Sequence, residues 1–157
     1  SQNPHAGHPS FSTAGTANRT SEYHGLTLGA LTAGDPSKPA LLLLHGWPHS
    51  NEVYDGVLAD LASDHFVLAF DLPAIGDSRG APLSAEKKEL ADILLGASER
   101  AGARSIVVAG FDVGGMVAHA AARDHAHRIV GAVIMACRAN KGEAWRGNKG
   151  KKGEGSK

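Results

Sequence analysis

The stretch Ser105–Gly115, SIVVAGFDVGG, decides the fold and the chemistry predicted for this chain. Its first half, Ser105–Ala109, is typical of a strand buried on both faces of a sheet. Gly110 and Gly114 then stand two residues before and two residues after Asp112. Small residues at these positions are what a sharp strand-to-helix turn needs, because the central residue is strained and neighbouring Cβ atoms would clash. The sequence therefore predicts a turn that lifts the Asp112 side chain above the carboxyl edge of a sheet.

This position suits Asp112 to a chemical role. The start of the following Ala-rich helix would aim unpaired amides and the positive end of its dipole at the side chain. A carboxylate held ionised there can attack carbon, so the implied chemistry is alkylation of Asp112 followed by hydrolysis of the ester. Asp is also a common helix N-cap. Taken alone, the turn favours this structural role and the nucleophile role equally.

Strand and helix patterns alternate along the rest of the chain. An antiparallel hairpin is expected over Tyr23–Thr32, ahead of the buried strands. The expected buried strands are Ala40–Leu44, His65–Phe70, Ser105–Ala109 and Ile129–Ala136. The expected helices contain Val53, Val57, Leu58 and Leu61, then Leu90 to Ala101 after an N-cap at Ser84, and then Gly114–His125. This alternation predicts an α/β fold with a mostly parallel sheet, crossover helices on both faces and an antiparallel pair at one edge.

Composition divides the chain into three parts. With 157 residues, 42% of them hydrophobic, and one cysteine, the chain is long enough for one domain and has no disulfide framework. Residues 1–21 are expected to be a polar, flexible leader, and residues 22–137 the folded body. Residues 138–157 carry seven basic and two acidic side chains, whereas residues 1–137 carry nine and fourteen. This basic Lys- and Gly-rich tail is expected to be disordered.

The sequence also bears on location. No stretch approaches the roughly 18 apolar residues of a membrane span. The polar start, Ser1–Thr20, lacks the basic end and apolar core of a secretory signal. Together with the lone Cys137, these features favour a cytoplasmic protein with no membrane partner.

Two further segments have the character of loops at strand ends. Leu41–Ser50, LLLLHGWPHS, and Phe70–Ser78, FDLPAIGDS, each run from a buried strand into a turn rich in Gly and Pro. Together with Ser105–Gly115, these segments resemble the α/β-hydrolase fold, and within it the epoxide hydrolase and haloalkane dehalogenase branch. That branch carries an HG-x-P loop, a D-x-P-G-x-G-x-S turn and an Asp nucleophile in G-x-D-x-G-G. The resemblance covers about residues 22–137, as the N-terminal half of such a domain.

The resemblance implies a site built around Asp112 as the nucleophile. It implies an oxyanion hole made by the backbone amides of Trp47 and Val113, with the Trp47 ring as a wall of the pocket. The residues expected to shape the site are His45, Gly46, Pro48, Gly110, Phe111, Gly114 and Gly115. The expected partner is a small-molecule epoxide or halogenated substrate, with no cofactor and no metal.

Three positions depart from the pattern of the branch. Phe111 stands where epoxide hydrolases usually have His, and Ala74 replaces the first Gly of the turn after Pro73. Val113 stands where haloalkane dehalogenases place a halide-holding Trp, which argues against a haloalkane substrate. The absence of Ser at position 112 disfavours the usual esterase or lipase chemistry.

The second half of the reaction has no evident residues. In the family that these segments resemble, a water-activating His and its acid partner follow later strands. In this sequence, no such pair is found before the apolar pattern of strands and helices stops at Cys137. His119, His125 and His127 are expected to lie too far from the turn. His45 and His49, on the loop beside the expected site, are the only candidates for the base, but they are expected to be structural or exposed instead. The acids at the other strand end, Asp71 and Asp77, are expected to fix their turn. The chain is therefore expected to be inactive alone, as a truncated or frame-shifted product.

Two other functions remain open at this stage. The same nucleophile would serve a haloacid substrate, and halide release would distinguish this activity from diol formation. Alternatively, the chain is a non-catalytic binding or scaffolding remnant that uses an exposed strand, Ile129–Ala136, and the basic tail. That strand is expected to support oligomers. No specific nucleic-acid partner is expected, because aromatic residues do not interleave with the Lys cluster.

Overall fold

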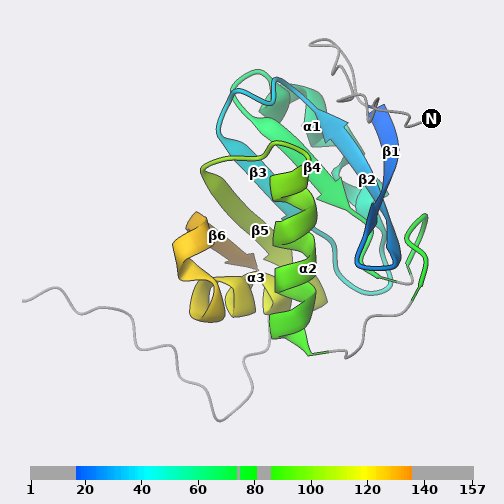
Figure 1. Cartoon of the computed structure of the whole chain (residues 1–157). Coiled ribbons are helices and arrows are strands. Elements are labelled where there is room, and N and C mark those ends of the chain that lie inside the picture. The colour runs from blue at the N-terminus through cyan, green and yellow to red at the C-terminus, as the bar shows by residue number, and fades with distance from the viewer. Residues whose placement is uncertain (1–16, 74, 81–85, 136–157) are drawn as a thin grey trace, which may run out of the picture.

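A six-stranded sheet forms the centre of the protein (Figure 1). The computed structural model describes residues 17–73, 75–80 and 86–135. Along the sheet the strands follow the order β1-β2-β4-β3-β5-β6. Their bounds are β1 Ala17–Tyr23, β2 Leu26–Ala33, β3 Ala40–Leu44, β4 Phe66–Phe70, β5 Ile106–Phe111 and β6 Ile129–Met135. The last four strands named in the order are parallel to one another, and β2 runs antiparallel to β4. The predicted fold class is confirmed.

The hairpin at one edge is longer than predicted. β1 pairs with β2 over seven residue pairs, from Ala17 with Thr32 to Tyr23 with Leu26. The turn is made by His24 and Gly25, both with positive φ. Residues 17–21, which the sequence assigned to the leader, therefore belong to the sheet. Their polar sequence gives no strand pattern, because β1 is an edge strand held chiefly by backbone hydrogen bonds to β2.

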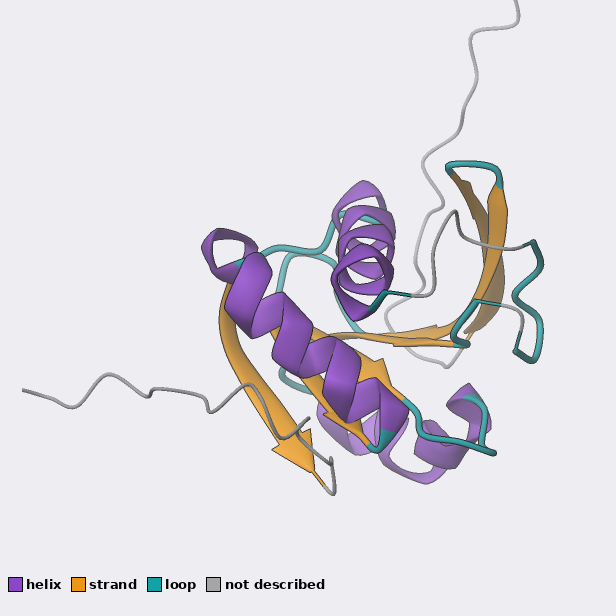
Figure 2. Ribbon diagram, turned by 90° about the horizontal axis from the view of Figure 1, so that it is seen from below, coloured by secondary structure: helices purple, strands orange, loops and turns teal. Residues whose placement is uncertain are grey.

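Helices cover both faces of the sheet (Figure 2). On one face, α2 (Lys87–Arg100) and α3 (Val113–Asp124) pack on a core that contains Leu42, Phe66 and Phe70. On the other face, α1 (Asp55–Ala62) contributes the fully buried Leu58 to a smaller core with Leu43 and Val67. These two layers hold the carboxyl ends of the parallel strands in place, and the predicted crossover arrangement is confirmed.

The helix boundaries correct several expectations. The first helical segment begins as a 3-10 turn, η1 (Asn51–Tyr54), and Val53 and Val57 point to solvent instead of into the core. α2 has Glu86 at its N-cap, and the predicted cap at Ser84 lies outside the described residues. α3 begins at Val113, one residue earlier than predicted. No helix of the part that the structure describes is long and apolar enough to cross a membrane.

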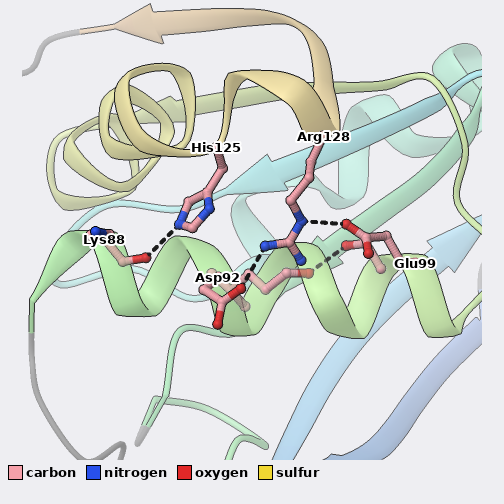
Figure 3. Close-up of polar contacts among 7 residues, drawn as sticks. Lys88, Asp92, Glu99, His125 and Arg128 are labelled. Carbon is pink, nitrogen blue, oxygen red and sulfur yellow. Dashed lines mark hydrogen bonds and ion pairs between the residues drawn. The ribbon is translucent and has the colours of Figure 1, made fainter.

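β6 lies at the end of the sheet, next to β5, and directly follows a short 3-10 turn, η2 (Ala126–Arg128). This turn is tied to α2 (Figure 3): the Arg128 guanidinium donates to Asp92 at 2.6 Å and to Glu99 at 2.7 Å. The His125 Nε2 donates to the Lys88 carbonyl oxygen at 3.1 Å. Along β6, the exposed apolar side chains are Val130, Val133, Ile134 and Met135. The strand is therefore fixed at its start and apolar on its surface.

Candidate active site

A single residue joins β5 to α3. β5 ends at Phe111, α3 begins at Val113, and Asp112 between them has φ 52° and ψ −121°. A Cβ at Gly110 would lie 2.4 Å from the Gly114 carbonyl oxygen, and a Cβ at Gly114 would lie 2.4 Å from the carbonyl oxygens of Leu44 and His45. Only glycine permits these approaches, so the two glycines allow the chain to turn sharply with Asp112 at its crest.

The Asp112 side chain is exposed and does not cap its own helix. Although Asp112 occupies the N-cap position of α3, its side chain makes no capping hydrogen bond. Instead, the Trp47 amide donates to its Oδ2 at 3.0 Å, across 65 positions of the sequence. The amides of Trp47 and then Val113 lower the pKa of this carboxyl below its ordinary value, and the charge of His49 acts in the same direction. The group is held as an accessible carboxylate.

The loop after β3 lies directly against this turn. A Cβ at Gly46 would come within 2.7 Å of the Phe111 ring and 2.9 Å of the Asp112 Cβ, so only glycine fits there. The Trp47–Pro48 peptide bond is cis. Trp47 is 70% exposed, and Pro48 and His49 are exposed beside it. The loop therefore presents the Trp47 amide to Asp112 while its side chains stay open to solvent.

His45 fixes the inner end of the loop. The ring is 1% exposed, its Nδ1–H donates to the Gly46 carbonyl oxygen at 3.1 Å, and its Nε2 accepts from the Leu72 amide at 3.0 Å. Burial lowers the pKa of this imidazole, which favours the neutral form that the two hydrogen bonds require. With both nitrogens engaged, His45 joins the loop after β3 to the turn after β4.

A row of rings supports the other side of Asp112. The His49 ring meets the Phe111 ring edge to face, with centroids 5.8 Å apart, and the Tyr54 ring meets Phe111 in the same manner at 6.2 Å. The Tyr54 hydroxyl donates to the Leu44 carbonyl oxygen at 2.7 Å, and burial raises its pKa to about 12. Sequence reasoning missed Tyr54, since nothing in its local pattern indicates contact with residue 111.

The turn after β4 places a second acid at the same edge of the sheet. Asp71 is buried, and its carboxyl accepts from the amides of Asn51 at 2.8 Å and Asp77 at 2.9 Å. The Ser78 hydroxyl donates to the Asp71 carbonyl oxygen at 2.7 Å. The expectation that Asp71 fixes its turn is confirmed, whereas Asn51, whose side chain donates to Ala69, was missed. Ala74 lies outside the described residues.

The remaining histidines are placed elsewhere. His119 lies in the middle of α3, and His125 and His127 lie at or beyond its C-terminal end, away from the turn that starts the helix. Among residues 17–73, 75–80 and 86–135, no group of three or more His, Cys, Asp or Glu side chains is arranged to hold a metal ion.

Comparison with known proteins identifies the protein family to which this fold belongs. The sequence profile of the alpha/beta hydrolase fold matches residues 39–150. The chain belongs to this family, which confirms the resemblance noted from its motifs.

Individual relatives include both esterases and epoxide hydrolases. The chain is 35% identical over 116 residues to a pimeloyl-[acyl-carrier protein] methyl ester esterase of Proteus mirabilis (strain HI4320), covering 71% of this chain and 42% of that protein. It is 34% identical over 102 residues to a soluble epoxide hydrolase of Corynebacterium sp. (strain C12), covering 65% and 35%.

Among solved structures, the ligand-free epoxide hydrolase CorEH is similar with a TM-score of 0.73 and 28% identity, covering 83% of this chain and 47% of that one. The chain thus spans less than half the length of the relatives it matches.

Proposed function

We propose that this chain carries the alkylation half of an epoxide hydrolase reaction, with Asp112 as the nucleophile. The observation that carries the proposal is that the exposed Asp112 carboxylate makes no capping hydrogen bond in α3 and accepts from the Trp47 amide at 3.0 Å. The turn acts as a nucleophile elbow, and the lowered pKa of Asp112 keeps the carboxylate ionised and ready to attack.

The two carboxylate oxygens have different tasks in this proposal. Oδ2 already accepts a hydrogen bond from the Trp47 amide, and the Val113 amide also acts on the carboxyl group. The other oxygen, Oδ1, attacks the epoxide carbon and becomes the ester oxygen. If a base activated water to add to the ester, negative charge would develop on Oδ2, where the amides of Trp47 and Val113 would form the oxyanion hole.

The substrate is a small molecule with an electrophilic carbon. The similarity to a soluble epoxide hydrolase and to CorEH supports an epoxide. The Trp47 ring is exposed, and its amide contacts the nucleophile, so the proposal gives this ring the role of a wall for an apolar or aromatic substituent. A halogenated acid is the second candidate, since carboxylate attack on its carbon requires the same Asp112, and release of halide instead of a diol would identify it.

Hydrolysis of the ester needs a base oriented by an acid. His45, which lies beside the elbow, has both ring nitrogens engaged by backbone groups and no carboxylate to orient it. The ester on Asp112 is therefore expected to persist instead of turning over. The chain is proposed to act in the cytoplasm, where small electrophiles are its substrates.

Peptide mapping of the alkylated protein tests this function. The chain is incubated with styrene oxide, digested and analysed by mass spectrometry, with Asp112→Asn as the control. The expected result is one added styrene oxide on the peptide that contains Asp112, absent from the variant. A folded protein, verified by circular dichroism, that gains no adduct on this peptide would exclude Asp112 as a nucleophile.

A second proposal concerns the surface of β6. Val130 is 68% exposed and Val133 is 48% exposed, on an edge strand that pairs only with β5 among the described strands. Such an edge is prone to pair with another chain. Self-association through β6 is tested by analytical ultracentrifugation of the wild type and Val133→Lys: a shift towards monomer in the variant supports it, and unchanged association excludes it.

A further inference from the structure

We infer that Asn51 is a positioning residue for the Trp47 amide, the donor that meets the Asp112 carboxylate. This role rests on the proposed function in one respect, because the Trp47 amide takes part in chemistry only if Asp112 is the nucleophile. Asn51 lies beyond the HG-x-P pattern of residues 45–48, and the sequence alone gave it no role. In the folded chain it is the second anchor of the loop that carries Trp47.

The loop that carries Trp47 runs between two buried polar residues. Its exposed part consists of Trp47, Pro48 and His49. On either side of this part, His45 is 1% exposed and Asn51 is 5% exposed. Exposed residues have little core packing to hold them in one place. The position of the Trp47 amide therefore depends strongly on how the two buried ends of the loop are fixed.

Asn51 fixes the far end of the loop with both its backbone and its side chain. Its amide donates to the Asp71 Oδ1 at 2.8 Å, and its Nδ2 donates to the Ala69 carbonyl oxygen at 3.1 Å. Ala69 lies in β4, and Asp71 directly follows this strand. Two buried hydrogen bonds from one residue to one strand end restrict its orientation as well as its place.

His45 fixes the near end of the loop to the same turn. Its Nε2 accepts from the amide of Leu72, the residue after Asp71, at 3.0 Å. The two anchors thus bind neighbouring residues of the turn after β4, so that the loop and this turn form one unit. The Trp47 amide lies between the anchors and donates to the Asp112 Oδ2 at 3.0 Å. Loss of the second anchor would free one end of the loop and displace this donor.

A fixed donor matters most when negative charge develops on the atom that it faces. In the proposed function, attack at Cγ on an ester of Asp112 places this charge on Oδ2, the oxygen that accepts from the Trp47 amide. Removal of one such donor typically slows a reaction by about 100- to 1,000-fold. The placement of Asn51 is therefore expected to affect cleavage of the ester.

Hydroxylamine cleaves such an ester without a base from the protein. Its nitrogen forms a bond to the Asp112 Cγ, and the bond between Cγ and Oδ1 breaks. The diol leaves with Oδ1 and takes a proton from the hydroxylamine nitrogen. The product on the protein is a hydroxamate of Asp112, which peptide mapping distinguishes from the ester by its mass.

Two substitutions of Asn51 and one matched control isolate its role. Asn51→Leu keeps the approximate shape of the side chain without the Nδ2 donor, and Asn51→Ala removes the side chain. Ser98→Ala on α2 is the control, because the Ser98 hydroxyl is also buried and donates to a backbone oxygen, that of Leu94, at 2.7 Å. The control loses a comparable hydrogen bond in a different part of the fold.

The position of the donor is measured by NMR, without any reaction. In ¹H–¹⁵N spectra of the full chain, the Trp47 amide signal reports its bond to the carboxylate. Asp112→Asn removes the charge of the acceptor and gives the direction in which the signal moves when this bond weakens. We expect both Asn51 variants to move the signal in that direction and Ser98→Ala to leave it in place. An unmoved signal in folded Asn51 variants, or equal movement in Ser98→Ala, would overturn the assignment.

The chemical effect is measured on protein labelled with styrene oxide. Hydroxylamine should cleave the Asp112 ester about 10-fold more slowly in both Asn51 variants, a part of the cost of losing the whole donor, and at the wild-type rate in Ser98→Ala. Equal rates in all the labelled proteins would also overturn the positioning role. Failure of the proposed function is distinct: the wild type would gain no label, while the NMR spectra would still decide whether Asn51 positions Trp47.

Discussion

Two aspartates follow buried strands at the carboxyl edge of the same sheet, but their surroundings differ. Asp71 follows β4, is 2% exposed and accepts from the amides of Asn51 and Asp77. Asp112 follows β5, is exposed, and meets the Trp47 amide with one of its oxygens. The first carboxyl group is enclosed by the backbone that it organises, whereas the second keeps an oxygen open to a ligand.

The comparison shows that residue type and position at a strand end do not define a nucleophile. Both acids have amides directed at them, but the turn after β4 folds back over Asp71. Gly76 approaches so closely that a Cβ there would meet the Asp71 carboxyl. The turn at Asp112 leads directly into a helix, which leaves the side chain uncovered. In the proposed function, the accessibility of its carboxylate is what distinguishes Asp112 from the structural Asp71.

The largest expected effect comes from blocking the elbow itself. Gly114→Ala places a Cβ 2.4 Å from the carbonyl oxygens of Leu44 and His45, so the backbone must shift. We expect a loss of about 3 kcal/mol in the free energy of unfolding, measured in urea, together with loss of Asp112 labelling. Gly56→Ala on α1, where a Cβ meets nothing within 4 Å, is the control and should gain up to about 1 kcal/mol. Equal stability of the two variants would contradict the strained turn.

Exchanging each acid for its amide tests the comparison directly. Asp71→Asn keeps an acceptor oxygen for one of the amides of Asn51 and Asp77 and turns its own NH2 group towards the other, so it should lower the free energy of unfolding by about 2 kcal/mol. Asp112→Asn should change this free energy by less than about 0.5 kcal/mol, since its side chain is exposed, but should abolish ester formation. Urea unfolding of both variants measures the difference. A stability loss at position 112 as large as that at position 71 would show that both acids are structural.

Removal of the Tyr54 hydroxyl tests the support of the elbow. Tyr54→Phe keeps the ring against Phe111 but loses the hydrogen bond to the Leu44 carbonyl oxygen. We expect the free energy of unfolding to fall by about 1 kcal/mol. Labelling of Asp112 should slow only slightly, because the ring remains in place. Full loss of labelling with unchanged stability would instead give the hydroxyl a chemical role.

The smallest effect is expected from pH. Burial lowers the pKa of His45 in the folded state, so the unfolded chain binds a proton more readily. Stability that is present above the ordinary imidazole pKa of about 6.5 is therefore lost as the pH falls below it. Urea unfolding at pH 7 and pH 6 measures the loss, and His45→Asn should show a smaller one. An equal loss in the variant would assign the effect to other groups.

Much of this architecture was predictable from local sequence. The apolar run Ala40–Leu44 matches β3 residue for residue, because a strand buried on both faces needs a continuous apolar sequence. The glycines around Asp112 predicted the sharp turn, because a tight bend leaves no space for Cβ atoms. The polar strand β1 was missed, since an edge strand depends on backbone pairing that no side-chain pattern records.

The contacts that assign roles were less predictable. The Trp47 amide reaches Asp112 across 65 positions, and the Tyr54 hydroxyl reaches the end of β3. The family resemblance suggested the first contact, but no pattern indicated the second. The enclosure of Asp71 depends on Asn51 from a different loop. Such long-range contacts follow from the folded sheet, and the surroundings of the two aspartates become distinct only there.

The most direct test compares the two aspartates within one sample. The rates of ester formation with styrene oxide at Asp112 and at Asp71 are measured by peptide mapping, first in the folded protein and then in urea. The account predicts that Asp112 reacts at least about 100-fold faster in the folded protein, and that the two rates become similar in urea. A ratio near one in the folded protein, or a ratio that urea leaves unchanged, would contradict the claim that the fold makes Asp112 a nucleophile.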